Sequence, residues 1–322
     1  MLTGALLAVT LLAVGWLWTA SRAPERNAPA RIVVEPGTPV RALGTRLEEA
    51  GVIRSPRLFE LWLRAGGDAG SIQAGTYEIP PGTSLPGVID MLLTGRTLLA
   101  SVTIPEGLRL EQQAGVAARA LAIDSAAFVA AATDSLFADS LGVDAPTLEG
   151  YLFPETYLVD PATDARQLVR IMVGEFQRTF GDGWRRRAES LGRSVAEIVT
   201  LASIVEEEAR VPEERPVIAG VFWNRLNEGI KLEADPTVQY ALGSHRQRVL
   251  YRDLEVDSPY NTYLYPGLPP GPIASPGRAS LEATLYPDSV PYLYFFATGE
   301  GGRHTFSETF AEHNRKRREL NR

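Results

Sequence analysis

The sequence contains no cysteine, which excludes disulfides, thiolate metal sites and cysteine nucleophiles. Histidine is scarce, with three residues that form no His-x-x-x-His pair of the kind that binds zinc. Excess positive charge is also lacking: the net charge of −7 argues against a nucleic-acid-binding protein. The basic cluster Arg315–Arg318 ends a predicted last helix, where cations are favourable. The sequence therefore indicates no metal, no cofactor and no nucleic-acid partner.

What is present describes a folded protein with room for more than one domain. The 322 residues are 45% hydrophobic and 22% charged, as in ordinary globular proteins. Residues 2–21 carry no charge and are long enough for one membrane-spanning helix, so residues 1–21 are predicted to be a transmembrane anchor. A cleaved signal peptide is the alternative, because small residues near Ala20 are suited to cleavage. Residues 22–30, rich in proline and alanine, form a linker.

Residues 31–97 predict a small α+β subdomain. Strands are expected near residues 31–36 and 75–79, because short β-branched or aromatic runs end there in Pro/Gly turns. Helices are expected over residues 40–50, 56–63 and 85–94, from their apolar spacing and capping serines. The order strand, helix, helix, strand, helix resembles the LysM-like modules of cell-wall proteins, and a plain α+β spacer is the alternative.

Residues 98–322 predict a larger, mixed α+β domain. Its segment Leu148-Glu-Gly-Tyr-Leu-Phe-Pro-Glu-Thr-Tyr157 combines aromatic rings with the carboxylates of Glu149 and Glu155. Aromatic rings stack on sugars and carboxylates accept hydrogen bonds from sugar hydroxyls, so the segment is a candidate saccharide site that includes Tyr157. A structured loop whose aromatic residues fill the core is an equally good interpretation.

A helix over residues 195–210 is the feature around which this domain is organised. Ser194 and Glu197 have the spacing of a capping box, and apolar residues recur at helical spacing and predict one buried stripe. The helix ends in Glu206, Glu207 and Glu208, although carboxylates are unfavourable at a helix C-terminus. A carboxyl beside apolar neighbours has a raised pKa and can act as a general acid. A solvated acidic helix end is the alternative.

Two stretches after this helix carry further candidates. Asp235 is predicted to cap a short helix with Pro236 in its first turn, a role that accounts for Asp235 structurally. The span 258–277 has six prolines and three glycines in twenty residues, so it is predicted to be a long irregular loop. Loops of this length are commonly functional, and Tyr260, Asn261 and Tyr263 are candidates for saccharide contacts.

Taken together, the motifs resemble the MltG (YceG-like) family of endolytic murein transglycosylases. The matching stretches run in family order: 148–157, 201–209, 221–226, 235–240, 260–263, 267–277, 291–296 and 304–306. The resemblance implies an N-terminal transmembrane helix, a LysM-like subdomain and a catalytic domain outside the bacterial cytoplasmic membrane, in the periplasm. It also implies that peptidoglycan is the substrate, with peptidoglycan synthases as possible partners.

The resemblance implies the site and the reaction as well. Glu206 is implied as the catalytic acid and base, which cleaves the bond between N-acetylmuramic acid and N-acetylglucosamine and leaves a 1,6-anhydro end. The enzyme would thus be a lyase that terminates glycan elongation. Glu208 is expected to support Glu206, and Glu149, Glu155, Tyr157, Asn224, Tyr260, Asn261 and Tyr263 are expected to contact substrate or support the loops. Two alternatives are a peptidoglycan hydrolase that uses Glu149 or Glu155 as its second carboxylate, and a non-catalytic glycan-binding scaffold.

Overall fold

The computed structural model describes residues 15, 19–68, 70–243, 249–299 and 301–320. The chain forms two compact units, both of mixed α and β structure. The first unit runs to Ser101 and includes Leu158–Thr163, and the second comprises Val102–Tyr157 and the chain from Asp164 onward. The α+β fold class predicted from the sequence is confirmed.

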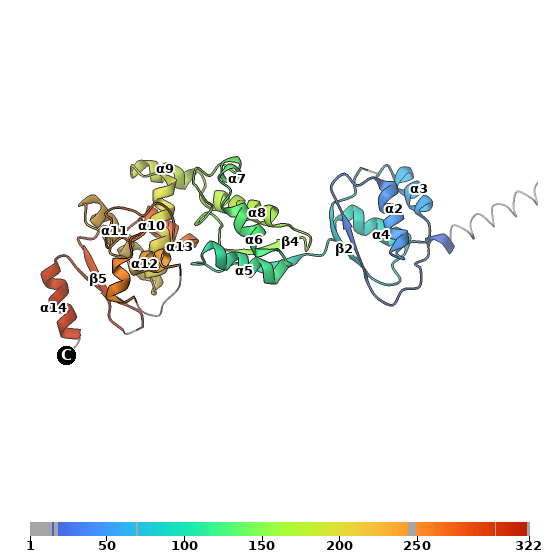
Figure 1. Ribbon diagram of the computed structural model, residues 1–322. Coiled ribbons are helices and arrows are strands. Elements are labelled where there is room, and N and C mark those ends of the chain that lie inside the picture. Colours follow the sequence, from blue (N-terminus) through green and yellow to red (C-terminus); the bar gives the residue numbers. More distant parts are fainter. Residues whose placement is uncertain (1–14, 16–18, 69, 244–248, 300, 321–322) are drawn as a thin grey trace, which may run out of the picture. The chain divides into compact units, whose positions relative to one another are not determined.

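The first unit has the predicted order of elements. Strands β1 (Ala30–Val34) and β2 (Gly75–Ile79) pair antiparallel, with Ala30 opposite Ile79 and Val34 opposite Gly75. Figure 1 shows the helices of this unit gathered beside β2. They are α2 (Val40–Glu49), α3 (Pro56–Gly66) and α4 (Leu85–Thr94). Their apolar faces meet in one core, in which Leu43, Phe59, Tyr77 and Leu92 have no exposed surface.

The predicted transmembrane anchor over residues 1–21 requires a correction. No helix in the described part of the chain is both long enough and apolar enough to cross a membrane. Residues 1–14 and 16–18 lie outside the described residues. The end of this stretch is helical at Thr19–Ser21, but Ala20 packs against the core of the first unit. The sequence argument relied on the apolar length of the stretch alone and took no account of this packing.

The second unit is mainly helical. Its α-helices are α5 (Leu110–Leu121), α6 (Ser125–Ala132), α7 (Ser135–Ser140), α8 (Ala165–Thr179), α9 (Asp182–Ser190), α10 (Val195–Glu208), α11 (Arg215–Asn227), α12 (Asp235–Ala241), α13 (Arg278–Leu285) and α14 (Phe310–Leu320). Two 3-10 helices are η1 (Pro212–Glu214) and η2 (Tyr251–Glu255). Strands β5 (Tyr294–Ala297) and β6 (His304–Ser307) pair antiparallel, and β3 (Ala100–Thr103) pairs with β4 (Thr156–Val159).

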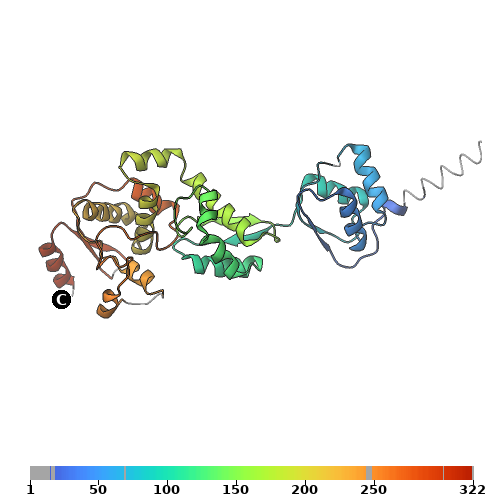
Figure 2. The ribbon, with the colours of Figure 1, turned by 45° about the horizontal axis from the view of Figure 1, so that its top comes forward.

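Helix α10 lies at the centre of the C-terminal part of this unit, beside α11, α12 and α13 (Figures 1 and 2). The predicted capping box is present, since the amide of Glu197 donates to Ser194 Oγ and the Glu197 carboxylate accepts from the Ser194 amide. The prediction of a single buried stripe is wrong, because every residue from Ile198 to Val205 is buried. Neighbouring helices cover all sides of α10, so it is a core helix and not a surface helix.

The span 258–277 contains no helix or strand, as its prolines predict. It is nevertheless largely buried near its end, where Ile273, Ala274 and Ser275 are at most 1% exposed. Its backbone is fixed to α10, because the amide of Ile273 donates to Ser203 Oγ (3.0 Å). Gly150, with φ of +80°, allows the close approach, since a Cβ there would lie 2.5 Å from Pro272. The loop is therefore a fixed wall beside the end of α10.

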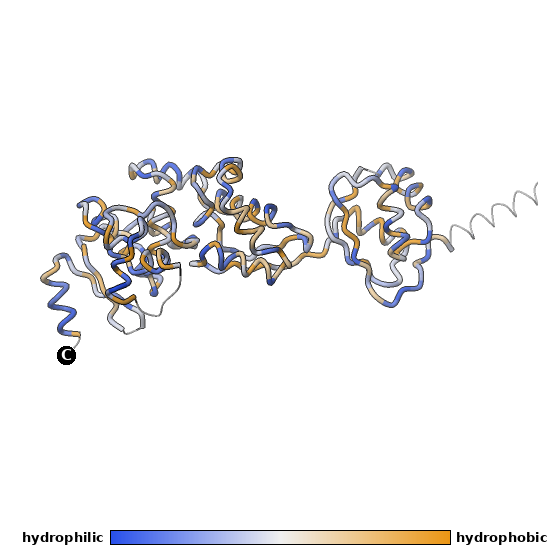
Figure 3. The backbone as a smooth tube through the Cα atoms, in the orientation of Figure 1, coloured by the Kyte–Doolittle hydropathy of each residue, from blue (hydrophilic) through white to orange (hydrophobic). Residues whose placement is uncertain are grey.

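Helix α14 has a different character from α10. Figure 3 shows mainly hydrophilic residues along α14, and none of its residues is buried. It packs against β5 and β6 through a cluster of aromatic rings. The ring centroid of His313 lies 5.1 Å from that of Phe296 and 6.2 Å from that of Phe310. Helix α14 therefore borders the second unit and does not belong to its core.

Candidate active site

The last turn of α10 places three carboxylates around the end of a buried helix. The turn contains no basic residue, and Ala209 follows it in an extended conformation. Carboxylates at this position are opposed by the helix dipole, so their charges require compensation from elsewhere. The three glutamates point into different surroundings, and this difference defines the site.

Glu206 is held by two hydrogen-bond donors. Its side chain is 8% exposed, and its Oε2 accepts from the amide of Gly277 at 3.0 Å. Its Oε1 lies 3.4 Å from Nη2 of Arg215, whose Nε donates to Ser280 Oγ at 3.1 Å. Because Arg215 belongs to α11 and Ser280 to α13, these contacts connect the end of α10 to both helices. Glu206 is therefore an ion-paired group that also fixes the position of the helix end.

Glu106 is a second carboxylate on the Glu206 side, and the sequence did not reveal it. It follows strand β3 and approaches Gly277 so closely that a Cβ on Gly277 would lie 1.9 Å from Glu106 Oε1. Burial and the charge of Glu206 raise the pKa of Glu106, and Arg215 lowers it. In the sequence, the only sign of this contact is that residue 277 is a glycine, because a residue with a Cβ would meet the Glu106 carboxylate. Glu106 itself lies far away in the chain.

Glu208 faces a different environment. It lines a polar cavity of about 660 Å³, and its carboxylate makes no hydrogen bond or ion pair with the other described residues. Burial raises the pKa of Glu208 to about 8, the charges of Asp235 and Glu207 add to the rise, and Arg210 opposes it. A carboxyl with this pKa holds its proton at neutral pH, which a general acid requires.

Asp235 and Tyr263 form the wall nearest to Glu208. The Tyr263 hydroxyl donates to Asp235 Oδ1 at 2.7 Å, and the negative charges of Asp235 and Glu208 contribute to raising the pKa of Tyr263. The prediction that Asp235 is an N-cap is wrong. Ala234 occupies that position with an extended backbone, and its amide donates to Thr262 Oγ1 at 3.0 Å. The carboxylate of Asp235 is thereby directed to Tyr263 in the cavity.

A carboxylate–histidine pair lies on another wall of the cavity. His304 Nδ1 is 2.8 Å from Glu214, and the His304 amide also donates to this carboxylate at 3.1 Å. The two side chains are only 5% and 11% exposed, so the ring orientation is fixed. The imidazole of His304 is therefore held through Nδ1, and Nε2 is the remaining polar atom of the ring.

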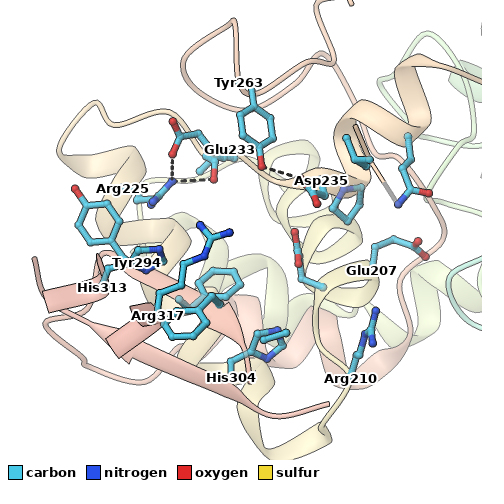
Figure 4. Close-up of a pocket in the computed structure, with 18 of the residues that line it drawn as sticks. Glu207, Arg210, Arg225, Glu233, Asp235, Tyr263, Tyr294, His304, His313 and Arg317 are labelled. Atoms are coloured by element: carbon cyan, nitrogen blue, oxygen red, sulfur yellow. Dashed lines mark hydrogen bonds and ion pairs between the residues drawn. The ribbon is translucent and has the colours of Figure 1, made fainter. Parts of the chain in front are cut away.

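Figure 4 shows that the cavity has two ends of different chemistry. Glu207, Arg210 and Asp235 lie toward one end, whereas Tyr294, His313 and Arg317 lie toward the other. Carboxylates, hydroxyls and aromatic rings in one cavity are typical of polysaccharide sites. No group of three or more His, Asp or Glu within the described ranges has an arrangement suited to a metal ion.

Most other predicted contact residues have structural partners. Asn224 Nδ2 donates to the carbonyls of Val290 and Tyr292, and Asn261 Nδ2 donates to those of Leu254 and Val256. Tyr157 is buried and its hydroxyl donates to the Phe153 carbonyl. These side chains hold the walls of the domain and do not line either of its two cavities.

Three further predicted residues, Glu149, Glu155 and Tyr260, also lie outside the lining of this cavity. Glu149 is 5% exposed and accepts from the Leu110 amide at 3.1 Å, at the start of α5; burial raises the pKa of Glu149 to about 7. Glu155 is exposed and accepts from the Thr156 amide. Tyr260 contacts Tyr240, with ring centroids 4.7 Å apart and the ring planes tilted by 44°. Among the predicted residues, only Tyr263 and Glu208 line the cavity of about 660 Å³.

The chain belongs to the YceG-like family, whose model matches residues 32–319. A Bacillus subtilis protein named endolytic murein transglycosylase is 37% identical over 307 residues, which cover 90% of this chain and 84% of that protein. A Streptococcus pneumoniae protein of the same name is 30% identical over 310 residues, and the match spans 56% of its length. The crystal structure of a yceG-like protein from Listeria monocytogenes, 34% identical, superposes with a TM-score of 0.62 over 90% of this chain and 100% of that one.

Proposed function

We propose that this chain is an endolytic murein transglycosylase, a lyase that cuts glycan strands internally. Relatives of that name align over nearly the whole chain. The observation that carries the proposal is Glu208, a carboxyl with a pKa of about 8 in a polar cavity of about 660 Å³. Such a group delivers a proton to a glycosidic oxygen at neutral pH.

The geometry favours Glu208 as the proton donor. Glu206, which the family resemblance implies, remains the competing prediction. Glu206 is bound by Arg215 and by the Gly277 amide, so both of its carboxylate oxygens have protein partners. Glu208 has neither interaction and faces the cavity. In this assignment Glu206 is a positioning residue that fixes the last turn of α10.

The reaction follows from one carboxyl that acts twice. Glu208 donates its proton to the oxygen of N-acetylglucosamine as the bond to the muramic anomeric carbon breaks. The resulting carboxylate then takes the proton of the muramic C6 hydroxyl, whose oxygen attacks the anomeric carbon and closes a 1,6-anhydro ring. No water is consumed, and the carboxyl returns to its starting state. Because the nucleophile belongs to the substrate, a second catalytic carboxylate is unnecessary.

Two walls of the cavity support this chemistry. The Tyr263–Asp235 hydrogen bond fixes a hydroxyl and a carboxylate near Glu208, where they are suited to sugar hydroxyls. His304, oriented by Glu214, is a second fixed polar side chain of the lining. Because the substrate is peptidoglycan, we place the action of the chain outside the bacterial cytoplasmic membrane, on nascent strands, where peptidoglycan synthases are candidate partners.

The test is mass spectrometry of products from uncrosslinked glycan strands. The full chain and its Glu208→Gln, Glu206→Gln and Glu213→Gln variants are compared, Glu213 being an exposed carboxylate in η1 that serves as the control. We expect internal cuts with 1,6-anhydro ends from the wild type and the control. We expect these products to be lost with Glu208→Gln and reduced with Glu206→Gln.

Other products would redirect the assignment. Reducing ends in place of anhydro ends identify a hydrolase. Loss of product with Glu206→Gln alone returns the acid role to Glu206. No cleavage by any of the proteins, together with retained glycan binding, identifies a scaffold.

A further inference from the structure

A second cavity of about 750 Å³ lies in the same unit and is not used by the reaction above. Arg109, Gln112 and Tyr240 line it, together with Glu111 and Glu207. Glu207 lines both cavities. Gly107, with φ of +75°, makes room for Glu207, because a Cβ there would lie 2.9 Å from Glu207 Oε1. The two cavities therefore meet at Glu207, next to the proposed proton donor.

The distinctive group of the second cavity is Arg109. Its guanidinium carbon lies 5.2 Å from the centre of the Tyr240 ring, and its Nη1 donates to the Gln239 carbonyl at 3.3 Å. Tyr240 in turn contacts the tilted ring of Tyr260, with ring centroids 4.7 Å apart. Within the described ranges of the chain, Arg109 forms no ion pair with a carboxylate. The arginine is thus a fixed cation whose remaining N–H groups have no protein acceptor in this part of the chain.

We propose that the second cavity binds a muramic residue that carries its peptide stem, and that Arg109 pairs with a carboxylate of that peptide. The inference rests on the proposed function, because it assigns a further part of the same substrate. A murein strand is a neutral polysaccharide apart from its peptides, whose carboxylates are its anionic groups. An arginine fork held on an aromatic ring is suited to bidentate binding of a carboxylate.

The acidic members of the cavity fit the same ligand. Glu111 and Glu207 would repel a free anion, so the cavity is not a general anion site. Their oxygens accept hydrogen bonds from sugar hydroxyls and acetamido N–H groups, whereas Gln112 Oε1 already accepts from the Arg109 amide at 2.9 Å. The cavity therefore favours a sugar that carries one carboxylate at a defined place, and it discriminates against a neutral sugar.

The test measures binding separately from cleavage. Two soluble glycan fragments of equal length are used, one a murein fragment with peptide stems and the other a bare oligomer of N-acetylglucosamine, which carries no carboxylate. Each is titrated calorimetrically into the Glu208→Gln protein, with mass spectrometry to show that the ligand remains uncut. Arg109→Gln and Arg109→Lys are compared with Arg119→Gln, which removes an exposed cation in the last turn of the same helix, α5.

We expect Arg109→Gln to weaken binding of the peptide-bearing fragment about tenfold, and to change the affinity for the bare fragment less than twofold. Arg109→Lys should recover part of the loss, and Arg119→Gln should have no effect. Equal loss for both fragments, or no loss for either, overturns the inference. Because binding is measured without turnover, the inference survives if the products of the wild type prove to be reducing ends.

Discussion

On the two sides of the last turn of α10, neighbouring carboxylates have opposite surroundings. On one side, Glu206 meets an arginine and a backbone amide, and it is 8% exposed. On the other side, Glu208 meets a cavity and the carboxylates of Asp235 and Glu207, and its pKa rises to about 8. Two residues of the same type, two positions apart, are thus suited to different tasks. The protonation state of a glutamate follows from its surroundings and not from its place in a motif.

The largest effect that tests this comparison is expected in the catalytic rate. We expect Glu208→Gln to lower kcat/KM about 10²- to 10⁴-fold, because a general acid contributes that much to a proton-transfer step. Glu206→Gln should lower it about tenfold or less, because the amide can still accept from Gly277 while the Arg215 charge pair is lost. Initial rates of anhydro-end formation measure both. A larger loss with Glu206→Gln reverses the roles.

The second test concerns the side on which Glu206 pairs with Arg215. Arg215→Met leaves Glu206 without its cation, and we expect it to reduce the free energy of unfolding by about 3 kcal/mol. Glu206→Gln should cost about 1 kcal/mol, because the amide can still accept from Gly277. Urea denaturation of the two single variants and the double variant gives the coupling. Strictly additive losses would show that the pair does not stabilise the protein.

The third test concerns the side on which Glu208 faces the cavity, and it measures how stability depends on pH. The pKa of Glu208 is raised from its ordinary value of about 4.5 to about 8, so the folded state binds the proton more tightly than the unfolded state. Stability from this group is complete below about pH 4.5 and is lost as the pH rises to about 8. Glu208→Gln removes this dependence. Relative to the wild type, we expect it to become more stable by about 4 kcal/mol between pH 5 and pH 9.

Thermal unfolding at several pH values measures this difference. Glu213→Gln serves as the control, because Glu213 is exposed. A difference between Glu208→Gln and wild type that is constant from pH 5 to pH 9 would show that the Glu208 pKa is not raised.

The smallest effect is expected at Gly277. A Cβ there would meet Glu106 Oε1 at 1.9 Å, but Glu106 is an exposed, flexible side chain that can move away. We expect Gly277→Ala to cost less than about 1 kcal/mol of stability. Gly150→Ala is the comparison, because its φ is +80° and Pro272 lies at 2.5 Å. It should cost about 2 kcal/mol or more in the same denaturation assay. Equal losses would show that Glu106 is held as rigidly as Pro272.

The sequence predicted local features well. The capping box of Ser194 and Glu197, the irregular loop over 258–277 and the order of elements in the first unit all follow from interactions between nearby residues. The assignment of Glu206 as the catalytic acid came from the family resemblance and stays a prediction. Helix caps and proline content depend on a few adjacent residues, so the sequence alone carries them.

Features that depend on distant residues were missed or misassigned. The sequence could not show that Glu106 approaches Gly277, because the two residues lie far apart in the chain and only folding brings them together. Asp235 has the sequence signature of a cap, yet Thr262 binds the preceding amide and leaves Asp235 to Tyr263. Asn224 and Asn261, predicted to bind sugar, are satisfied by backbone carbonyls. The partner of a polar side chain, and not its type, decides its role.

The attachment of the loop to α10 has a consequence for the order in which the protein folds. The Gly277 amide reaches Glu206 across 71 positions of the chain, and the Ile273 amide reaches Ser203 across 70. Contacts of such separation form late, because the chain must first close a long loop. Helix α10 can therefore exist in a chain whose glutamates are still unplaced. A nascent or partly folded molecule carries the acidic motif but no assembled site, so its folding itself delays the onset of glycan cleavage.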